Sequence, residues 1–236
     1  AASQFAITYD SSPPTTSISS SLSTSTNVST IPITVIFGRE VVGFDASDVV
    51  IDNGSLSNFS GSGTTYTFDV TPSSDGIVTV DIAAAVCEDS NGLLNQAASQ
   101  YSITYDGTAP TVIISSTLTL PTNATTIPIT ITFSELVAGF DSGDLVIGNG
   151  NISSFTGSGE NYTFNIMPLE DGTITIDIGA GVCADDAGNS NTAASQNTIT
   201  YDGTAPTVII SSTLTSPTTT SPIPVTIVFS ESVTGF

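Results

Sequence analysis

The sequence has almost no positive charge. Arg39 is the single basic residue, lysine and histidine are absent, and 22 acidic residues give a formal net charge of -21. Nucleic acids and anionic membrane surfaces are recognised largely through Lys and Arg, which neutralise phosphate groups. The composition therefore predicts that neither is a partner of this chain.

The missing side chains also remove most catalytic chemistry. Without histidine there is no imidazole base, no Ser-His-Asp triad and no His-ligated zinc, and without lysine there is no Schiff base. The one conceivable catalytic set is a group of carboxylates, Glu135 with Asp185 and Asp186. Carboxylates in linker loops rarely enclose a substrate, so we predict that the chain is not an enzyme.

Long apolar runs are absent as well. No stretch of eighteen apolar residues occurs, which argues against direct insertion of this chain into a membrane. Hydrophobic residues still make up 39% of the chain, and its mean hydropathy is +0.28. That is enough apolar material for two sandwich-sized cores, so we predict a folded protein rather than a disordered acidic tail.

Only two cysteines are present, and they occupy equivalent positions in two sequence repeats. Cys87 and Cys183 lie 96 residues apart, one in each repeat, so neither repeat can form an internal disulfide. A free cysteine of this kind usually packs as a small apolar residue at the end of a strand. Crosslinking between chains is the alternative.

A repeat of 96 residues organises the chain. Tyr9-Asp10 recurs as Tyr105-Asp106 and Tyr201-Asp202, and the Phe, Pro and Cys positions keep the same register. We divide the chain accordingly: residues 1–10 are the last strand of a preceding repeat, 11–106 are repeat one, 107–202 are repeat two, and 203–236 are the first strands of an incomplete third repeat.

The pattern inside repeat two predicts β-strands. Apolar and polar residues alternate with period two, as a half-buried antiparallel strand requires. The predicted strands contain Val112–Ile114, Ile127–Phe133, Leu145–Ile147, Tyr162–Ile166, Ile174–Ile178 and Ile199–Tyr201. Glycine, asparagine and aspartate turns separate them. We predict an all-β fold of tandem immunoglobulin-like sandwiches, each a Greek key of about seven antiparallel strands, with almost no helix.

An ordered set of motifs supports this fold. The set comprises Val-Ile-Phe with Val-x-Gly-Phe-Asp, Phe-x-Gly-Ser-Gly, Ala-Asp-Asp-Ala-Gly-Asn and Tyr-Asp-Gly-Thr-Ala-Pro-Thr. Together these motifs resemble the bacterial Ig-like repeats of large extracellular surface adhesins. The resemblance implies an extracellular location at the cell surface, a stalk of repeats that contact one another, and calcium near the domain junctions.

Acidic loops suggest where calcium would lie. In an immunoglobulin-like topology, the linker entering a domain, the loop after its second strand and the loop before its last strand lie at one end. The carboxylate and amide oxygens of acidic residues and asparagine in these three segments are ligands that suit calcium. The candidate ligands are Asp106 from the linker, Glu135, Asp141 and Asp144 from the second loop, and Asp185, Asp186 and Asn189 from the last loop. Alternatively, these residues are solvated turn formers.

Repeat one departs from this pattern. Arg39, Ser90 and Leu93 stand where repeat two has Glu135, Asp186 and Asn189. We therefore expect its calcium site to be weaker or absent.

Three functional interpretations follow from the sequence. The leading one is a stalk or spacer of an extracellular adhesin or filament, because a constant repeat builds a regular rod. The second is a carbohydrate- or protein-binding module that uses its loops. The third is a fibre subunit completed by strand exchange with other copies of the chain.

Overall fold

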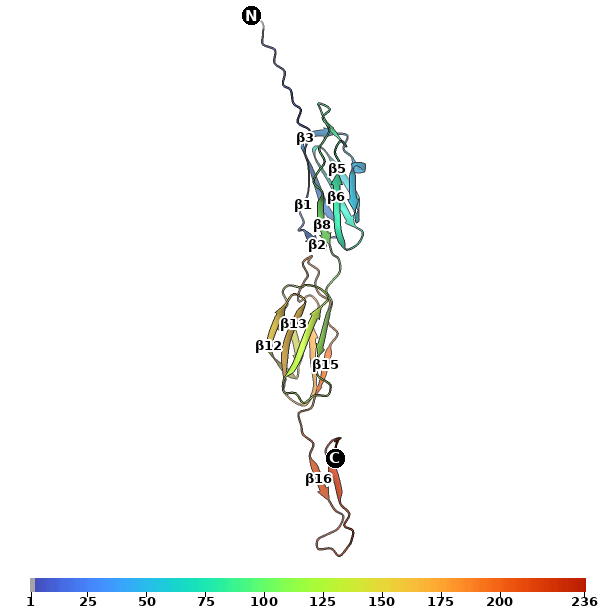
Figure 1. Cartoon of the computed structure of the whole chain (residues 1–236), viewed down its shortest axis with the longest axis vertical. Coiled ribbons are helices and arrows are strands. Elements are labelled where there is room, and N and C mark those ends of the chain that lie inside the picture. The colour runs from blue at the N-terminus through green and yellow to red at the C-terminus, as the bar shows by residue number, and fades with distance from the viewer. Residues whose placement is uncertain (1–2) are drawn as a thin grey trace.

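The repeats follow one another end to end. A computed structural model describes residues 3–236 and shows two β-sandwiches and a terminal hairpin in order along one long axis (Figure 1). Each sandwich forms its own hydrophobic core. The described chain is therefore elongated, and each repeat has a hydrophobic core of its own.

Repeat two contains seven strands in two antiparallel sheets. One sheet has the order β12-β13-β10-β9, and the other has the order β11-β14-β15. The strands are β9 (Val112–Ser116), β10 (Ile127–Phe133), β11 (Leu145–Gly148), β12 (Gly150–Ser158), β13 (Asn161–Pro168), β14 (Gly172–Ile178) and β15 (Asn197–Tyr201). A four-stranded and a three-stranded sheet with this connectivity form the immunoglobulin constant-type sandwich, which confirms the predicted fold class.

Repeat one has the same plan with local differences. Its sheets have the orders β1-β3-β5 and β2-β8-β6-β4, with β7 paired to β3. The strands are β1 (Thr16–Ser20), β2 (Ser25–Thr26), β3 (Ile31–Val42), β4 (Val49–Asp52), β5 (Gly54–Pro72), β6 (Gly76–Ile82), β7 (Glu88–Asp89) and β8 (Tyr101–Tyr105). β3 is longer than its counterpart β10 because Val41 and Val42 pair with β7.

The core of each repeat is formed by the apolar side chains that alternate with polar ones along the strands and face inward. Along β10, Ile127, Ile129, Ile131 and Phe133 are almost fully buried, whereas Thr132 faces solvent. Burying a side chain of this size contributes roughly 1.5–3 kcal/mol relative to leaving it exposed. Phe133, Phe140 and Tyr162 also pack edge to face. The hydrophobic pattern thus fixes which sheet faces meet.

One strand of repeat two does not follow the predicted alternation. The register of β12 shifts between Ser153 and Thr156, and Ser154 has a positive φ of 55°. A β-bulge of this kind places two residues opposite one and breaks the two-residue period. β12 was therefore not among the strands predicted from the sequence.

Helical structure is limited to two short turns in the described part of the chain. They are the 3-10 turns η1 (Ala46–Asp48) and η2 (Ser142–Asp144), in agreement with the expectation of almost no helix. Within residues 3–236, no helix is long and apolar enough to cross a membrane.

The two ends of the chain carry less structure. Residues 203–236 contain the hairpin of β16 (Val208–Ser211) and β17 (Thr226–Phe229). Residues 3–10 form no strand, whereas their counterparts β8 and β15 pair with β6 and β14. Residues 1 and 2 lie outside the described residues. The assignment of residues 1–10 to a preceding repeat stays a prediction.

Candidate metal site at the repeat junction

The linker between the two repeats begins at Asp106, directly after β8. The backbone N–H of Asp106 donates to the carbonyl of Thr26 in repeat one (3.0 Å). Its own carbonyl accepts a hydrogen bond from the Asn189 side chain in repeat two (2.8 Å). A further bond joins Asn27 N–H of repeat one to the Ala187 carbonyl of repeat two (3.1 Å). Both repeats therefore hold this residue in place.

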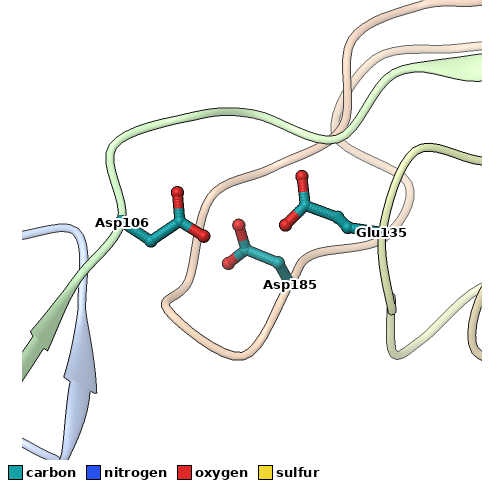
Figure 2. A group of neighbouring side chains, drawn as sticks. All are labelled: Asp106, Glu135 and Asp185. Carbon is teal, nitrogen blue, oxygen red and sulfur yellow. The ribbon is translucent and has the colours of Figure 1, made fainter. Parts of the chain in front are cut away.

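Three carboxylates meet at this junction. Asp106 comes from the linker, Glu135 from the loop after β10, and Asp185 from the loop between β14 and β15 (Figure 2). One oxygen atom from each group lies within 4.8 Å of the others, and all three residues are half-buried. The predicted convergence of linker and loop carboxylates is thus present for these three residues.

Asn189 adds a connection inside the group. Its backbone N–H donates to Asp185 Oδ1 (2.8 Å), and its side-chain Nδ2 donates to Asp185 Oδ2 (2.9 Å). Because Nδ2 also bonds the Asp106 carbonyl, Asn189 links the last loop of repeat two to the linker. It acts here as a hydrogen-bond donor that orients Asp185.

A buried asparagine outside the predicted ligand set shapes the loop carrying Asp185. Asn191 is 2% exposed, and its side chain bonds four backbone groups. Its Oδ1 accepts from Val182 N–H (2.9 Å) and Cys183 N–H (3.1 Å), and its Nδ2 donates to the carbonyls of Gly179 and Thr192 (both 2.9 Å). All its hydrogen-bonding capacity is satisfied within the loop. Asn191 therefore fixes the shape of the β14–β15 loop.

The repeat itself contained the signal for this residue. Asn95 lies 96 residues before Asn191 and is 3% exposed. It makes the corresponding bonds to Val86, Cys87 and Ala83. An asparagine that recurs in register, eight residues after each cysteine, marked this position, although the sequence did not show that it was buried.

Within the group in repeat two, the ionised form of Glu135 is disfavoured. The pKa of Glu135 is raised, chiefly by burial and then by the negative charges of Asp106, Asp185 and Asp75. Burial and like charges both disfavour the ionised carboxylate. Asp75 belongs to repeat one, so acidic groups on both sides of the junction contribute to this repulsion.

The same position in repeat one already contains a cation. Arg39 is the counterpart of Glu135, and its guanidinium lies 2.8 Å from Asp10 and 3.1 Å from Asp89. Asp10 and Asp89 are the counterparts of Asp106 and Asp185 in the 96-residue register. Arg39 therefore supplies a positive charge between these two carboxylates, which gives a physical basis for the expectation that repeat one binds calcium weakly or not at all.

The ion pairs in repeat one stabilise the ionised carboxylates. The pKa of Asp89 is lowered, first by the hydrogen bond from Leu93 N–H and also by Arg39. The pKa of Asp10 is lowered by the bond from Ser12 N–H and then by Arg39. These directions are opposite to that of Glu135, which stands in repeat two at the position of Arg39.

The remaining candidate ligands are not part of the group. Asp141 and Asp144 cap the η2 turn: Asp141 N–H donates to Asp144 Oδ2 (2.8 Å), and Gly143 N–H donates to Asp141 Oδ1 (2.6 Å). Their carboxylates serve local backbone groups, as the turn-forming interpretation expects. Asp186 is exposed beside Asp185, next to a shallow pocket lined by Leu136, Val137 and Ala138.

The three grouped carboxylates have chemistry that suits a divalent cation. Calcium takes oxygen ligands at 2.3–2.6 Å, so two ligands on opposite sides of one ion are about 4.6–5.2 Å apart. The spacing of Asp106, Glu135 and Asp185 is compatible with that limit. An ion held between them would supply the positive charge that Arg39 supplies in repeat one.

Comparison with known proteins gives a family match over most of the chain. The bacterial Ig-like domain matches residues 10–105 and again residues 106–201. No curated protein sequence gives a significant match.

The solved structures that match this chain share little sequence with it. The bacterial integrin-binding protein invasin is 15% identical over 84% of this chain, with a TM-score of 0.45, and the match spans 42% of the invasin chain. Yersinia pseudotuberculosis InvD is 14% identical over 92% of this chain and 68% of its own, with a TM-score of 0.39. The mouse nectin-like molecule 4 ectodomain is 14% identical over 80% of this chain and 65% of its own, with a TM-score of 0.34.

Proposed function

Because the chain belongs to the bacterial Ig-like domain family, we propose that it is a stalk region of an extracellular adhesin at the cell surface. The observation that carries this proposal is the junction, where the linker is hydrogen-bonded to both repeats as they follow one another end to end (Figure 1). Tandem units that each contact only their neighbours build a long, regular rod. Such a rod would hold a binding region away from the cell.

Calcium would complete the junction of repeat two in this proposal. Asp106, Glu135 and Asp185 would hold the ion, with Asn189 orienting Asp185. The support is the raised pKa of Glu135, caused mainly by burial, together with the guanidinium at the same position of repeat one. Extracellular modules commonly bind calcium with dissociation constants of about 0.1–1 mM. The ion would stiffen the rod rather than drive its folding.

The burial of the aromatic side chains favours a structural role over a sugar-binding role. Between residues 11 and 202, every Phe and Tyr is buried or half-buried. Phe37, Phe44 and Tyr66 pack together in repeat one, as their counterparts do in repeat two. Aromatic rings that could stack on a carbohydrate are thus part of the core. We propose a non-catalytic spacer rather than a binding module.

The proposal is tested by measuring the rod with and without its cation. Small-angle scattering and calorimetry would be recorded on the 236-residue chain in calcium, in magnesium and in chelator, at moderate salt. We expect an extended particle in all conditions and a higher melting temperature in calcium. At tenfold excess over the dissociation constant, the stabilisation of one site is roughly 1.4 kcal/mol. Glu135→Gln should remove most of it.

The outcomes separate the parts of the proposal. A compact, folded-back particle would overturn the stalk, whereas an extended particle with no response to calcium would overturn only the metal site. Growth of the particle mass with concentration would favour the strand-exchange fibre. A calcium response that Glu135→Gln leaves intact would place the ion elsewhere.

A further inference from the structure

Each linker donates hydrogen bonds to an aspartate of the repeat that precedes it. Asp75 lies in the turn between β5 and β6 of repeat one and accepts hydrogen bonds from Gly107 N–H (2.7 Å) and Thr108 Oγ1 (2.5 Å). Ninety-six residues later, Asp171 accepts from Gly203 N–H (2.6 Å) and from the hydroxyl of Thr204. The same contact therefore occurs at both linkers, with the same sequence separation.

The glycine of each linker allows this approach. A Cβ atom added to Gly107 would lie 2.7 Å from the Tyr105 hydroxyl and 3.5 Å from Asp75 Oδ1. Gly203 lies in the same way against the Tyr201 hydroxyl. Since Tyr105 is partly buried against the core of repeat one, its ring has limited room to move. A larger residue at this position would therefore displace the Tyr105 side chain.

The C-terminal end of the linker between repeats one and two is hydrogen-bonded to repeat two. Thr111 N–H donates to Ser134 Oγ (2.9 Å), and Thr192 N–H donates to the Pro110 carbonyl (2.8 Å). Inside the linker, Thr108 N–H donates to Asp106 Oδ1 (2.9 Å). Bonds to both repeats leave little freedom for the few residues between them.

We propose that Asp75 and Asp171 are clamp residues that fix the direction in which each following repeat leaves its predecessor. The clamp consists of the hairpin aspartate, the Gly-Thr pair 32 and 33 residues later, and the tyrosine that ends the last strand. Because it recurs at both linkers, it gives successive junctions the same geometry. It also holds Asp106 in position beside Glu135 and Asp185, and it does not require a bound ion.

The clamp predicts a narrow distribution of distances between the repeats. Spin labels would be attached at Ser60→Cys and Ser158→Cys, which are exposed sites in repeats one and two, while Cys87 and Cys183 stay buried. Pulsed electron paramagnetic resonance in chelator then reports the junction without any contribution from a cation. Asp75→Ala and Thr108→Val each remove one side of the contact. We expect Asp75→Ala to broaden the distribution about twofold, as local ordering is lost.

Asp171→Ala is the matched control, because it removes the same contact from the linker after repeat two. Broadening by Asp75→Ala and Thr108→Val, with no change from Asp171→Ala, supports the clamp. An unchanged width in Asp75→Ala, or equal broadening by Asp171→Ala, overturns it. Asp75 is exposed, so the melting temperature of repeat one should stay the same and show that the variant is folded. A failed calcium response would leave this result unaffected.

Discussion

Arg39 and Glu135 occupy the same position in consecutive repeats but carry opposite charges. The guanidinium of Arg39 forms ion pairs with Asp10 and Asp89, whereas Glu135 lies against Asp106 and Asp185, the counterparts of those two aspartates. Repeat one thus has a built-in positive charge, and repeat two has a third negative charge instead. Glu231 stands at this position in residues 203–236. The chain therefore places opposite charges at one position of the same backbone plan.

Glu135→Arg should make the junction of repeat two independent of calcium. The substitution replaces a carboxylate whose pKa is raised by burial and by its acidic neighbours with the group that repeat one uses. We expect a higher melting temperature in chelator and no further rise in calcium, measured by calorimetry. Glu170→Gln removes an exposed acidic group in the turn between β13 and β14 and should leave the calcium response intact. A calcium response retained in Glu135→Arg would contradict this prediction.

Arg39→Glu should have the opposite effect in repeat one. It removes two ion pairs and creates a group of three carboxylates around a partly buried position. Asp89 is 4% exposed and would lose its cationic partner, so repeat one should melt earlier in chelator. Calcium should restore part of the loss. Arg39→Met removes the charge without adding a carboxylate, and its melting temperature should respond less to calcium.

The two repeats should respond differently to acid in chelator. The pKa values of Asp10 and Asp89 are lowered by backbone bonds and by Arg39, so their contribution to stability is present above the ordinary carboxyl pKa and is lost as pH falls through the lowered values. The raised pKa of Glu135, caused chiefly by burial, has the opposite effect on stability as pH falls. Repeat two should gain stability as pH falls through that value. Melting curves between neutral pH and about pH 3 would reveal this, and Glu135→Gln should remove the gain.

Asn191→Ala should destabilise repeat two because buried backbone groups lose their partners. Four bonds from this side chain hold the β14–β15 loop, and each unsatisfied buried group costs about 1–3 kcal/mol. Denaturant unfolding would measure the loss, and calcium binding should weaken because Asp185 belongs to the same loop. Asn151→Ala, at an exposed position of β12, is the control and should have little effect. Equal stability of the two variants would show that the loop forms without Asn191.

Cys87 and Cys183 should not react with alkylating agents in the folded chain. Both thiols are buried, and burial raises the pKa of each to about 11, with a smaller contribution from Asp48 or Asp144. The thiolate, which is the reactive form, is therefore scarce at neutral pH. Mass spectrometry should detect alkylation only after denaturant is added. Rapid labelling of the native chain would revive the interchain crosslinking alternative.

The sequence by itself determined the period, most of the strands of repeat two and the fold class. Alternation along Ile127–Phe133 and Ile174–Ile178 could be recognised because a strand places successive side chains on opposite faces. The same argument failed for β12, where the bulge at Ser154 interrupts the period. Local patterns predict local structure when the backbone is regular.

Only the tertiary structure decided which acidic residues meet. Asp141, Asp144 and Asp185 looked equally suitable in sequence, yet the first two cap a turn and the third joins Asp106 and Glu135. Sequence also gave no sign that Asp75 reaches the next linker. These contacts join segments that are 29 to 79 residues apart, and only the packing of the two sheets and the path of the linker bring them together.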